Sequence, residues 1–224
     1  VRAWDRLKGR VVYLALTDLK LAYRDSLLKQ SLRSVEAGGG RLWGPTGRWV
    51  VLSVTFQVRQ AYMSHPIAYK QLASHLGVEL GEAVLELRRS KGMVLDPADH
   101  NTWSSGSFFT NPVLTQEQAD KLPSQAPRFE VTDHSMIVGT RPAPVVPGLV
   151  KTSAAWLIQH AGFGPGFALD DAASLSTVHV LAITNRGNAS AGDIEALAKT
   201  VIAGVRDKYG LTLVPEPVRV GLDF

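Results

Sequence analysis

A serine between a glycine and two aromatic residues is the first candidate for chemistry in this sequence. Ser107 stands in the run Gly106-Ser107-Phe108-Phe109-Thr110-Asn111-Pro112, directly after the polar segment 96–106. Polar, irregular segments often carry function. Three interpretations are open: a hydrolase nucleophile, a loop serine that bonds to backbone, and an acid that protonates a carbanion beside a hydride donor.

The nucleophile interpretation has little support in the sequence. His100 would be the base, and Asp99 or Asp96 would orient it. The elbow Gly-x-Ser-x-Gly is absent, because Phe109 stands where the second glycine should be. Triad partners need not be neighbours in sequence, so the closeness of His100 adds little.

Two cations and one carboxylate are further candidates. Arg24 and Lys91 are single cations near the ends of predicted elements, where most such side chains are solvated. Glu216 lies between Pro215 and Pro217, and the fixed φ of proline stiffens the backbone around it. A carboxylate held in this way can have a positional role, although Pro-Glu-Pro is also a common turn.

Neither a metal site nor a phosphate loop is predicted. The six histidines show no His-x-x-x-His or His-Glu-x-x-His spacing. His179 falls in a predicted apolar strand, where a core histidine is the default. The Gly-rich segment 36–48 could present backbone N–H groups to an anion, but it lacks the Gly-Lys-Ser/Thr ending and the following helix of a P-loop. We expect a plain hairpin connection there.

The elements that position these residues follow from periodicity and capping. The clearest is a helix over 190–209, with Ser190 and Asp193 as a capping pair and Gly210 as its stop. Segment 123–149 is Pro-rich and reads as a long loop or short irregular strands. Further helices are expected over 66–76, 80–91 and 151–161 and from Thr115 to Pro123. Strands are expected over 11–16, 50–58, 178–184, 211–214 and 218–221. Without regular β-α-β alternation, the order favours an α+β fold.

Composition narrows the class of protein. The 224 residues are 45% hydrophobic and 20% charged, which is ordinary for a globular protein. No apolar run approaches the roughly 20 residues of a membrane span. The net charge of +4 comes from scattered residues and there is no cysteine, so we expect no nucleic-acid partner, no membrane partner and no thiolate chemistry. The chain begins at Val1 without a methionine, so we expect the true N-terminus upstream.

Three separated segments together resemble one family, the UDP-N-acetylenolpyruvoylglucosamine reductases, also called UDP-N-acetylmuramate dehydrogenases. Segment 22–29 (Ala-Tyr-Arg-Asp-Ser-Leu-Leu-Lys) is similar to the family's Tyr-Arg-x-Ser segment, and 106–112 to its Gly-Ser-Phe-Phe-x-Asn-Pro signature. Segment 213–219 (Leu-Val-Pro-Glu-Pro-Val-Arg) is similar to its C-terminal Glu-containing strand. The likeness runs over essentially the whole chain, as the C-terminal three fifths of such an enzyme.

The resemblance implies a flavin-dependent reduction in peptidoglycan precursor synthesis. Such an enzyme binds FAD, reduces it with NADPH and passes hydride from flavin N5 to the enolpyruvyl ether of a UDP-sugar. Arg24 would hold the substrate carboxylate, because its planar fork matches one. Glu216 would have to be protonated or share a proton to help. Ser107 would give its proton to the α-carbon.

The resemblance also implies binding roles, domain limits and a setting. Residues 1–93 would be the remainder of an FAD-binding domain, 94–210 a substrate-binding domain, and 211–224 strands that return to the FAD lobe. We expect a cytoplasmic monomer with a small-molecule UDP-sugar as its partner. The implied substrate contacts are Tyr69, Lys91, Asn111, Lys151 and His179, and the implied cofactor contacts are Arg88, Tyr23 and Gly106.

The chain departs from the family pattern in several places. The family's N-terminal lobe, with its Gly-Gly-Gly-Ser-Asn flavin-diphosphate loop, is not in this sequence, and Gly38-Gly39-Gly40 is not that loop. Segment 143–148 lacks a tyrosine that relatives often carry, and Lys151 is followed by Thr-Ser-Ala-Ala instead of Leu-Ala-Ala-Gly. Two other functions therefore stay open: a non-catalytic nucleotide-sugar-binding fragment without FAD, and a serine hydrolase.

Overall fold

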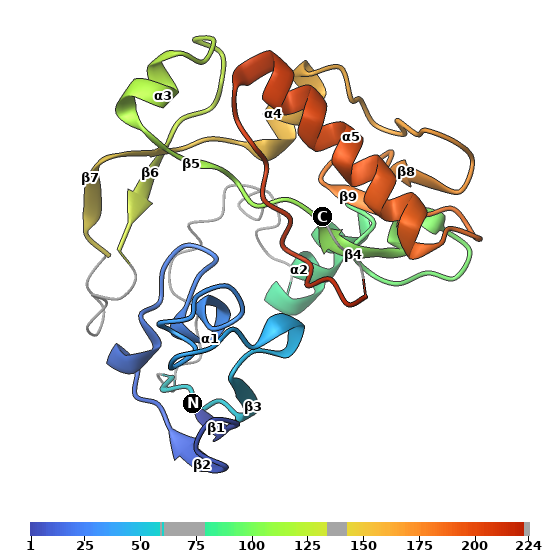
Figure 1. The fold of residues 1–224 in the computed structure, drawn as a ribbon. Coiled ribbons are helices and arrows are strands. Elements are labelled where there is room, and N and C mark those ends of the chain that lie inside the picture. The colour runs from blue at the N-terminus through green and yellow to red at the C-terminus, as the bar shows by residue number, and fades with distance from the viewer. Residues whose placement is uncertain (59, 61–78, 134–142, 222–224) are drawn as a thin grey trace.

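Small antiparallel sheets and short helices make up the computed structural model, which describes residues 1–58, 60, 79–133 and 143–221 (Figure 1). The helices are α1 (Leu27–Gln30), α2 (Leu80–Arg89), α3 (Gln116–Asp120), α4 (Ala154–His160) and α5 (Ala191–Tyr209). Among the described residues, short 3-10 turns cover Thr17–Leu19, Gly44–Thr46 and His100–Thr102. The strands are β1 (Arg2–Asp5), β2 (Arg10–Tyr13), β3 (Trp49–Ser53), β4 (Ser104–Ser107), β5 (Val113–Thr115), β6 (Phe129–Thr132), β7 (Val145–Lys151), β8 (Ala173–Leu175) and β9 (Ala182–Asn185). This mixture is α+β, as the sequence predicts.

The strands of the described ranges form three sheets of three strands each, in the orders β2-β1-β3, β4-β9-β8 and β5-β7-β6. All the pairings are antiparallel. The first sheet lies with α1 at one end of the molecule, and the other two lie with α3, α4 and α5 at the other end (Figure 1). The chain after α5 then runs back toward the first part (Figure 1).

A buried ion pair fastens the N-terminal sheet. Asp5, at the end of β1, is 1% exposed and accepts from Nε and Nη2 of Arg48 at 3.0 and 2.7 Å. Its Oδ1 also accepts from the backbone of Leu7 and Lys8. Because Arg48 directly precedes β3, this ion pair links the central strand β1 to its neighbour β3.

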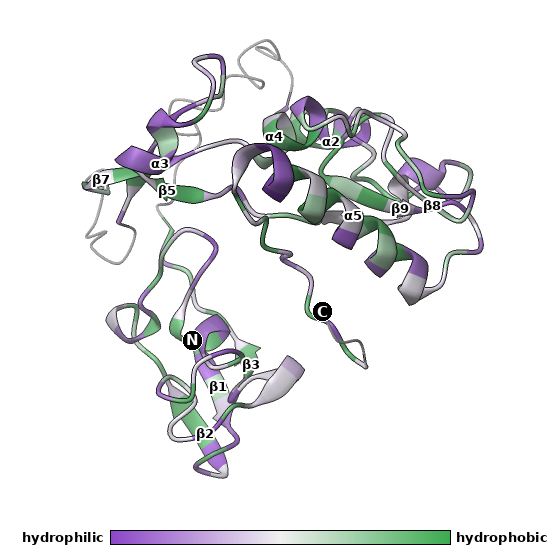
Figure 2. Ribbon diagram, turned by 45° about the horizontal axis from the view of Figure 1, so that its top comes forward, coloured by the Kyte–Doolittle hydropathy of each residue, from purple (hydrophilic) through white to green (hydrophobic). Residues whose placement is uncertain are grey.

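The main hydrophobic core lies between the β4-β9-β8 sheet and the helices α4 and α5. Leu197, Ala198, Val201 and Val205 give α5 a buried stripe at helical spacing, and hydrophobic and hydrophilic residues alternate along it (Figure 2). Ser190 and Asp193 form the capping box that the sequence predicts. Gly210 ends the helix in the left-handed conformation. No helix in the described ranges is long and apolar enough to cross a membrane.

Several predicted elements are confirmed with shifted ends. Thr115 caps α3 through a capping box, and α2 ends at Arg89, two residues before the predicted limit. The predicted helix over 151–161 instead begins at Ala154, because Lys151 belongs to β7 and the Ser153 side chain accepts from Trp156 N as the cap. Segment 123–149 contains strands, β6 and most of β7. The predicted helix over 66–76 lies outside the described residues.

The predictions for the N-terminal sheet are partly wrong. The strand expected over 11–16 is Arg10–Tyr13, and the one expected over 50–58 ends at Ser53. Segment 36–48 is not a hairpin connection, because β3 pairs with β1 and not with the strand before the loop. The short strand β1, absent from the prediction, takes the central position and so decides both pairings.

Two predicted C-terminal features are also wrong. The strand expected over 178–184 begins at Ala182, because the chain turns first: Ser176 Oγ accepts from the backbone of Val178 and His179. Between 211 and 221 no strand forms, and the pairing is a single bridge between Phe109 and Pro215. The prolines at 215 and 217 lack the N–H donors that a longer ladder needs.

Candidate functional site

A tight turn presents Arg24. Ala22 and Asp25 exchange two backbone hydrogen bonds of 3.1 and 3.2 Å, so the two residues between them form the tip. Arg24 has φ +53°, in the left-handed region that non-glycine residues seldom adopt. The turn is anchored by the Asp25 side chain, whose Oδ2 accepts from Gln30 at 3.1 Å and pairs with Arg33 at 2.9 Å.

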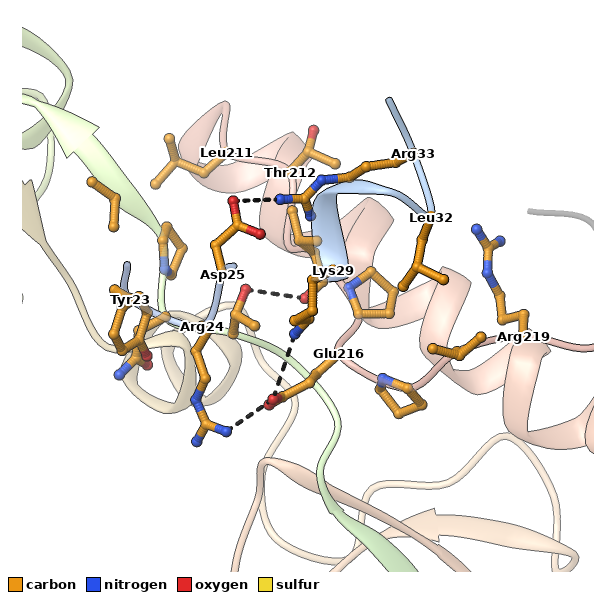
Figure 3. A pocket seen from close by; sticks show the side chains of 18 of the residues that line it. Tyr23, Arg24, Asp25, Lys29, Leu32, Arg33, Leu211, Thr212, Glu216 and Arg219 are labelled. Carbon is orange, nitrogen blue, oxygen red and sulfur yellow. Dashed lines mark hydrogen bonds and ion pairs between the residues drawn. The ribbon is translucent and has the colours of Figure 1, made fainter. Parts of the chain in front are cut away.

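Arg24 reaches across the molecule to Glu216. Its Nη1 lies 2.8 Å from Glu216 Oε1, and Lys29 Nζ lies 3.9 Å from the same oxygen (Figure 3). The Ser26 side chain caps α1, the helix that carries Lys29, by accepting from Lys29 N. Lys29 is not among the site residues predicted from the sequence. Its position five residues after Arg24 in the same motif was the available signal.

Backbone pairing fixes Glu216 beside the residues that follow Ser107. Glu216 N donates to Phe108 O at 2.8 Å, and Thr110 N donates to Val214 O at 3.0 Å. Together with the Phe109–Pro215 bridge, these bonds hold the C-terminal segment antiparallel to 108–110. The spacing between Ser107 and Glu216 is therefore set by backbone and not by flexible side chains.

Ser107 is the last residue of β4, directly after an irregularity in that strand. The register between β4 and β9 shifts between Ser104 and Ser107, and Gly106 has φ +80°. Such a shift is typical of a bulge, a feature that can re-aim a side chain. Ser107 Oγ lies 3.2 Å from Nε2 of His179.

His179 is half-buried in the turn before β9, not in a core strand as predicted. Burial, and secondarily the positive charge of Lys91, lowers the pKa of His179. Both effects disfavour the imidazolium, so the neutral ring is favoured.

One cavity of about 890 Å³, here called the Ser107 cavity, joins most of the candidate residues. A second cavity of about 770 Å³, the Lys29 cavity, is drawn in Figure 3. Both cavities are lined by Arg24, Glu216 and Pro217. The predicted site residues in the Ser107 cavity are Arg24, Arg88, Lys91, Gly106, Ser107, His179 and Glu216.

The remaining predicted site residues lie elsewhere. Tyr23 and Asn111 line the Lys29 cavity, and Lys151 Nζ lies 4.4 Å from the centre of the Tyr23 ring, a cation–π contact. Asn111 Oδ1 accepts from Ala154 N, the first residue of α4, at 2.9 Å. Tyr69 lies outside the described residues.

The Ser107–His100 pair that the hydrolase interpretation requires does not form. The histidine bonded to Ser107 is His179, whereas the His100 ring packs edge-on against Trp103 with centroids 4.6 Å apart. Asp99 accepts from Asn101 N, which caps the 3-10 turn at His100. In the ranges that the structure describes, no group of three or more His, Cys, Asp or Glu side chains could hold a metal ion.

Comparison with known proteins decides the family. The family model described as UDP-N-acetylenolpyruvoylglucosamine reductase, C-terminal domain, matches residues 96–220, which is more than half of the chain. The chain belongs to this family. A reductase of this name from Cutibacterium acnes is 46% identical over 99% of the chain, and those from Mycobacterium sp. strain MCS and Nocardia farcinica are each 43% identical over 99% of it.

The chain spans between 54% and 59% of the length of these relatives. The match confirms the resemblance expected from segments 22–29, 106–112 and 213–219. The 96–220 range includes Ser107, His179 and Glu216, whereas Arg24 and Lys91 precede it.

Proposed function

We propose that the polypeptide containing this chain reduces UDP-N-acetylglucosamine enolpyruvate to UDP-N-acetylmuramate, with FAD as cofactor and NADPH as reductant. Family membership supports the reaction class. The observation that carries the proposal is the Ser107 cavity, in which an acid, a guanidinium and a carboxylate from three distant segments meet. The same reaction implies a role in peptidoglycan precursor synthesis.

The residues of the Ser107 cavity fit a planar, anionic cofactor. A side chain built on Gly106 would meet no atom within 4 Å, so the space above this backbone is open to a flat ring. Arg88 and Lys91 bring positive charge to the same cavity, which suits a diphosphate or an anionic ring. Arg88 and Gly106, with Tyr23 at the neighbouring turn, would hold FAD, which supplies hydride when bound and reduced.

Arg24 would bind the carboxylate of the enolpyruvyl group. When hydride adds to the terminal carbon, negative charge develops on the α-carbon and its carboxylate, and a preorganised cation stabilises it. Glu216 and Lys29 hold the guanidinium in place through the ion pairs to Oε1. This arrangement uses the carboxylate form of Glu216, whereas the expectation from the resemblance is a carboxyl group that is protonated or shares a proton.

Ser107 would complete the reduction by protonating the α-carbon. Its hydroxyl lines the Ser107 cavity together with Arg24, so an enolpyruvyl carboxylate on the guanidinium brings the α-carbon toward Oγ. The Ser107 O–H bond breaks as the new C–H bond forms, and the electron pair of the former double bond makes that C–H bond.

The UDP part would bind through the remaining polar residues. Lys91 suits the diphosphate by its charge. Asn111, with its oxygen already bonded to Ala154 N, would meet the ligand through its NH2 group. Lys151 and Tyr69 would complete these contacts. The protein would be a cytoplasmic monomer, with domain limits at 1–93, 94–210 and 211–224.

Substitution of Ser107 tests the proposal in the polypeptide encoded by the complete reading frame. We expect Ser107→Ala to leave flavin reduction by NADPH intact and to abolish formation of UDP-N-acetylmuramate. Ser124→Ala, in an exposed turn, serves as the matched control and should keep both flavin reduction and product formation. Undiminished turnover in Ser107→Ala would exclude the proton-donor role.

The two other functions predict different results in the same experiment. A serine hydrolase would cleave esters without flavin, and Ser107→Ala would remove that activity. A non-catalytic nucleotide-sugar-binding protein would bind the UDP-sugar without flavin absorbance or NADPH oxidation.

A further inference from the structure

The direction of the hydrogen bond between Ser107 and His179 depends on the tautomer of the ring, and it decides where the Ser107 hydroxyl hydrogen points. A hydroxyl group carries a single hydrogen. If Ser107 donated it to Nε2 at 3.2 Å, that hydrogen would point at the ring and away from a ligand. If Nε2 carries the hydrogen instead, it donates to Oγ, and the hydroxyl hydrogen can point into the cavity.

The charges around His179 favour a neutral ring with one N–H. Burial and the charge of Lys91 both lower the pKa of His179. The other charged groups of the Ser107 cavity are Arg24, Arg88 and Glu216. Two of these three are cations, and the carboxylate is occupied by Arg24 and Lys29.

Hydrogen bonds of the backbone hold the turn that carries His179. Ser176 Oγ accepts from His179 N at 3.2 Å, and His179 O accepts from Ala182 N at 2.8 Å at the start of β9. Phe108 N donates to Leu181 O at 2.7 Å, directly after Ser107. Backbone hydrogen bonding therefore joins the segments that carry Ser107 and His179.

We propose that His179 is a positioning residue for Ser107: its Nε2–H donates to Oγ, turns the hydroxyl hydrogen into the Ser107 cavity, and stabilises the oxygen as its proton leaves. This inference rests on the proposed function and differs from the substrate-binding role implied by the resemblance. When the Ser107 O–H bond breaks and the α-carbon gains the proton, the negative charge remains on Oγ. The Nε2–H bond is retained, and Oγ regains a proton from solvent.

The tautomer of His179 is the direct test. In the complete polypeptide labelled with ¹⁵N-histidine, nitrogen chemical shifts report which ring nitrogen carries the hydrogen. We expect a protonated Nε2, with its shift changed in Ser107→Ala. An unprotonated Nε2 near neutral pH would overturn the inference, because Ser107 would then be the donor, the arrangement that a nucleophile uses.

Two variants test the functional consequence. Glutamine keeps an N–H donor but does not titrate, whereas leucine has no donor. We expect His179→Leu to lower turnover of the enolpyruvyl substrate by about 10- to 100-fold, the range for a lost hydrogen bond to a charged group, and His179→Gln to restore most of it. Circular dichroism checks that each variant is folded.

The outcomes separate this inference from the proposed function. Equal turnover in wild type and both variants would overturn the role of His179 while leaving the reductase proposal in place. Equal losses in both variants would also overturn it, because an N–H donor should restore function. If wild type does not reduce the enolpyruvyl substrate, the proposed function fails, and a protonated Nε2 would still support the hydrogen-bond direction.

Discussion

Glu216→Gln separates two roles for this carboxylate. A glutamine amide resembles a protonated carboxyl group in shape and in having a donor, but it cannot be ionised. If Glu216 acts as a neutral hydrogen-bond donor, the variant should stay active, because the amide N–H can replace the carboxyl O–H. If it acts as the ionised partner of Arg24 and Lys29, at 2.8 and 3.9 Å, the variant should lose activity.

The expected effect on stability is small. The side chains of Arg24 and Glu216 are 52% and 26% exposed, so water and salt screen their attraction. Ion pairs of this kind contribute about 0.2 to 1 kcal/mol to the free energy of unfolding. The backbone bond from Glu216 N to Phe108 O is unaffected by the substitution and keeps the C-terminal segment in place.

The expected effect on turnover is much larger. Arg24 lies at the tip of a two-residue turn, and the carboxylate of Glu216 directs its guanidinium. A misplacement of about 1 Å in a positioning group can cost about 100-fold in rate, or about 2.7 kcal/mol of the activation free energy. We therefore expect Glu216→Gln to lower kcat by about 100-fold. The free energy of unfolding should fall by less than about 1 kcal/mol.

The assay compares urea unfolding with NADPH oxidation driven by the enolpyruvyl substrate in the complete polypeptide. Glu117→Gln is the matched control, because it breaks an ion pair of the same 2.8 Å length to Lys121, with side chains 70% and 81% exposed. Glu117→Gln should lose as little stability as Glu216→Gln does, and it should keep the turnover of the wild type. A Glu216→Gln enzyme with wild-type kcat would refute the ion-pair role and favour a protonated carboxyl.

Two further predictions concern the scaffold of the site. Asp5→Ala should lower the free energy of unfolding by about 3 to 5 kcal/mol, measured in urea, because it leaves the guanidinium of Arg48 buried without its partner. Burial opposes ionisation of Asp5, but hydrogen bonds from Arg48, Lys8 and Leu7 outweigh it and lower the pKa. The stability from this group is thus complete above the pKa of an unfolded aspartate, about 3.9, and is lost as the pH falls through the lower folded value. Gly106→Ala should cost about 1 to 2 kcal/mol from backbone strain alone, since φ is +80° and no atom obstructs the new Cβ. Gly106→Asn should cost less in the same unfolding measurement, and equal stability of all three proteins would contradict this reasoning.

Elements with local determinants were predictable from the sequence. The helix α5 and the cap of α3 depend on hydrogen bonds between residues three apart, which short motifs record. Strand limits were less predictable, because a strand exists only where a partner lies beside it. The short strand β1 shows this, since it decides the pairing of β2 and β3 from the centre of their sheet.

For the site, the sequence by itself determined which residue types are present and, through three separated motifs, the family. Only the tertiary structure decided which of them meet. The bonds from Arg24 to Glu216 and from Ser107 to His179 join residues 192 and 72 positions apart. Periodicity and capping describe interactions within a few residues, whereas these pairs depend on backbone bonds between distant segments, such as Glu216 N to Phe108 O. The partner of Ser107 is therefore His179 and not the nearby His100, because the fold brings the turn before β9, and not the neighbouring 3-10 turn, to the hydroxyl.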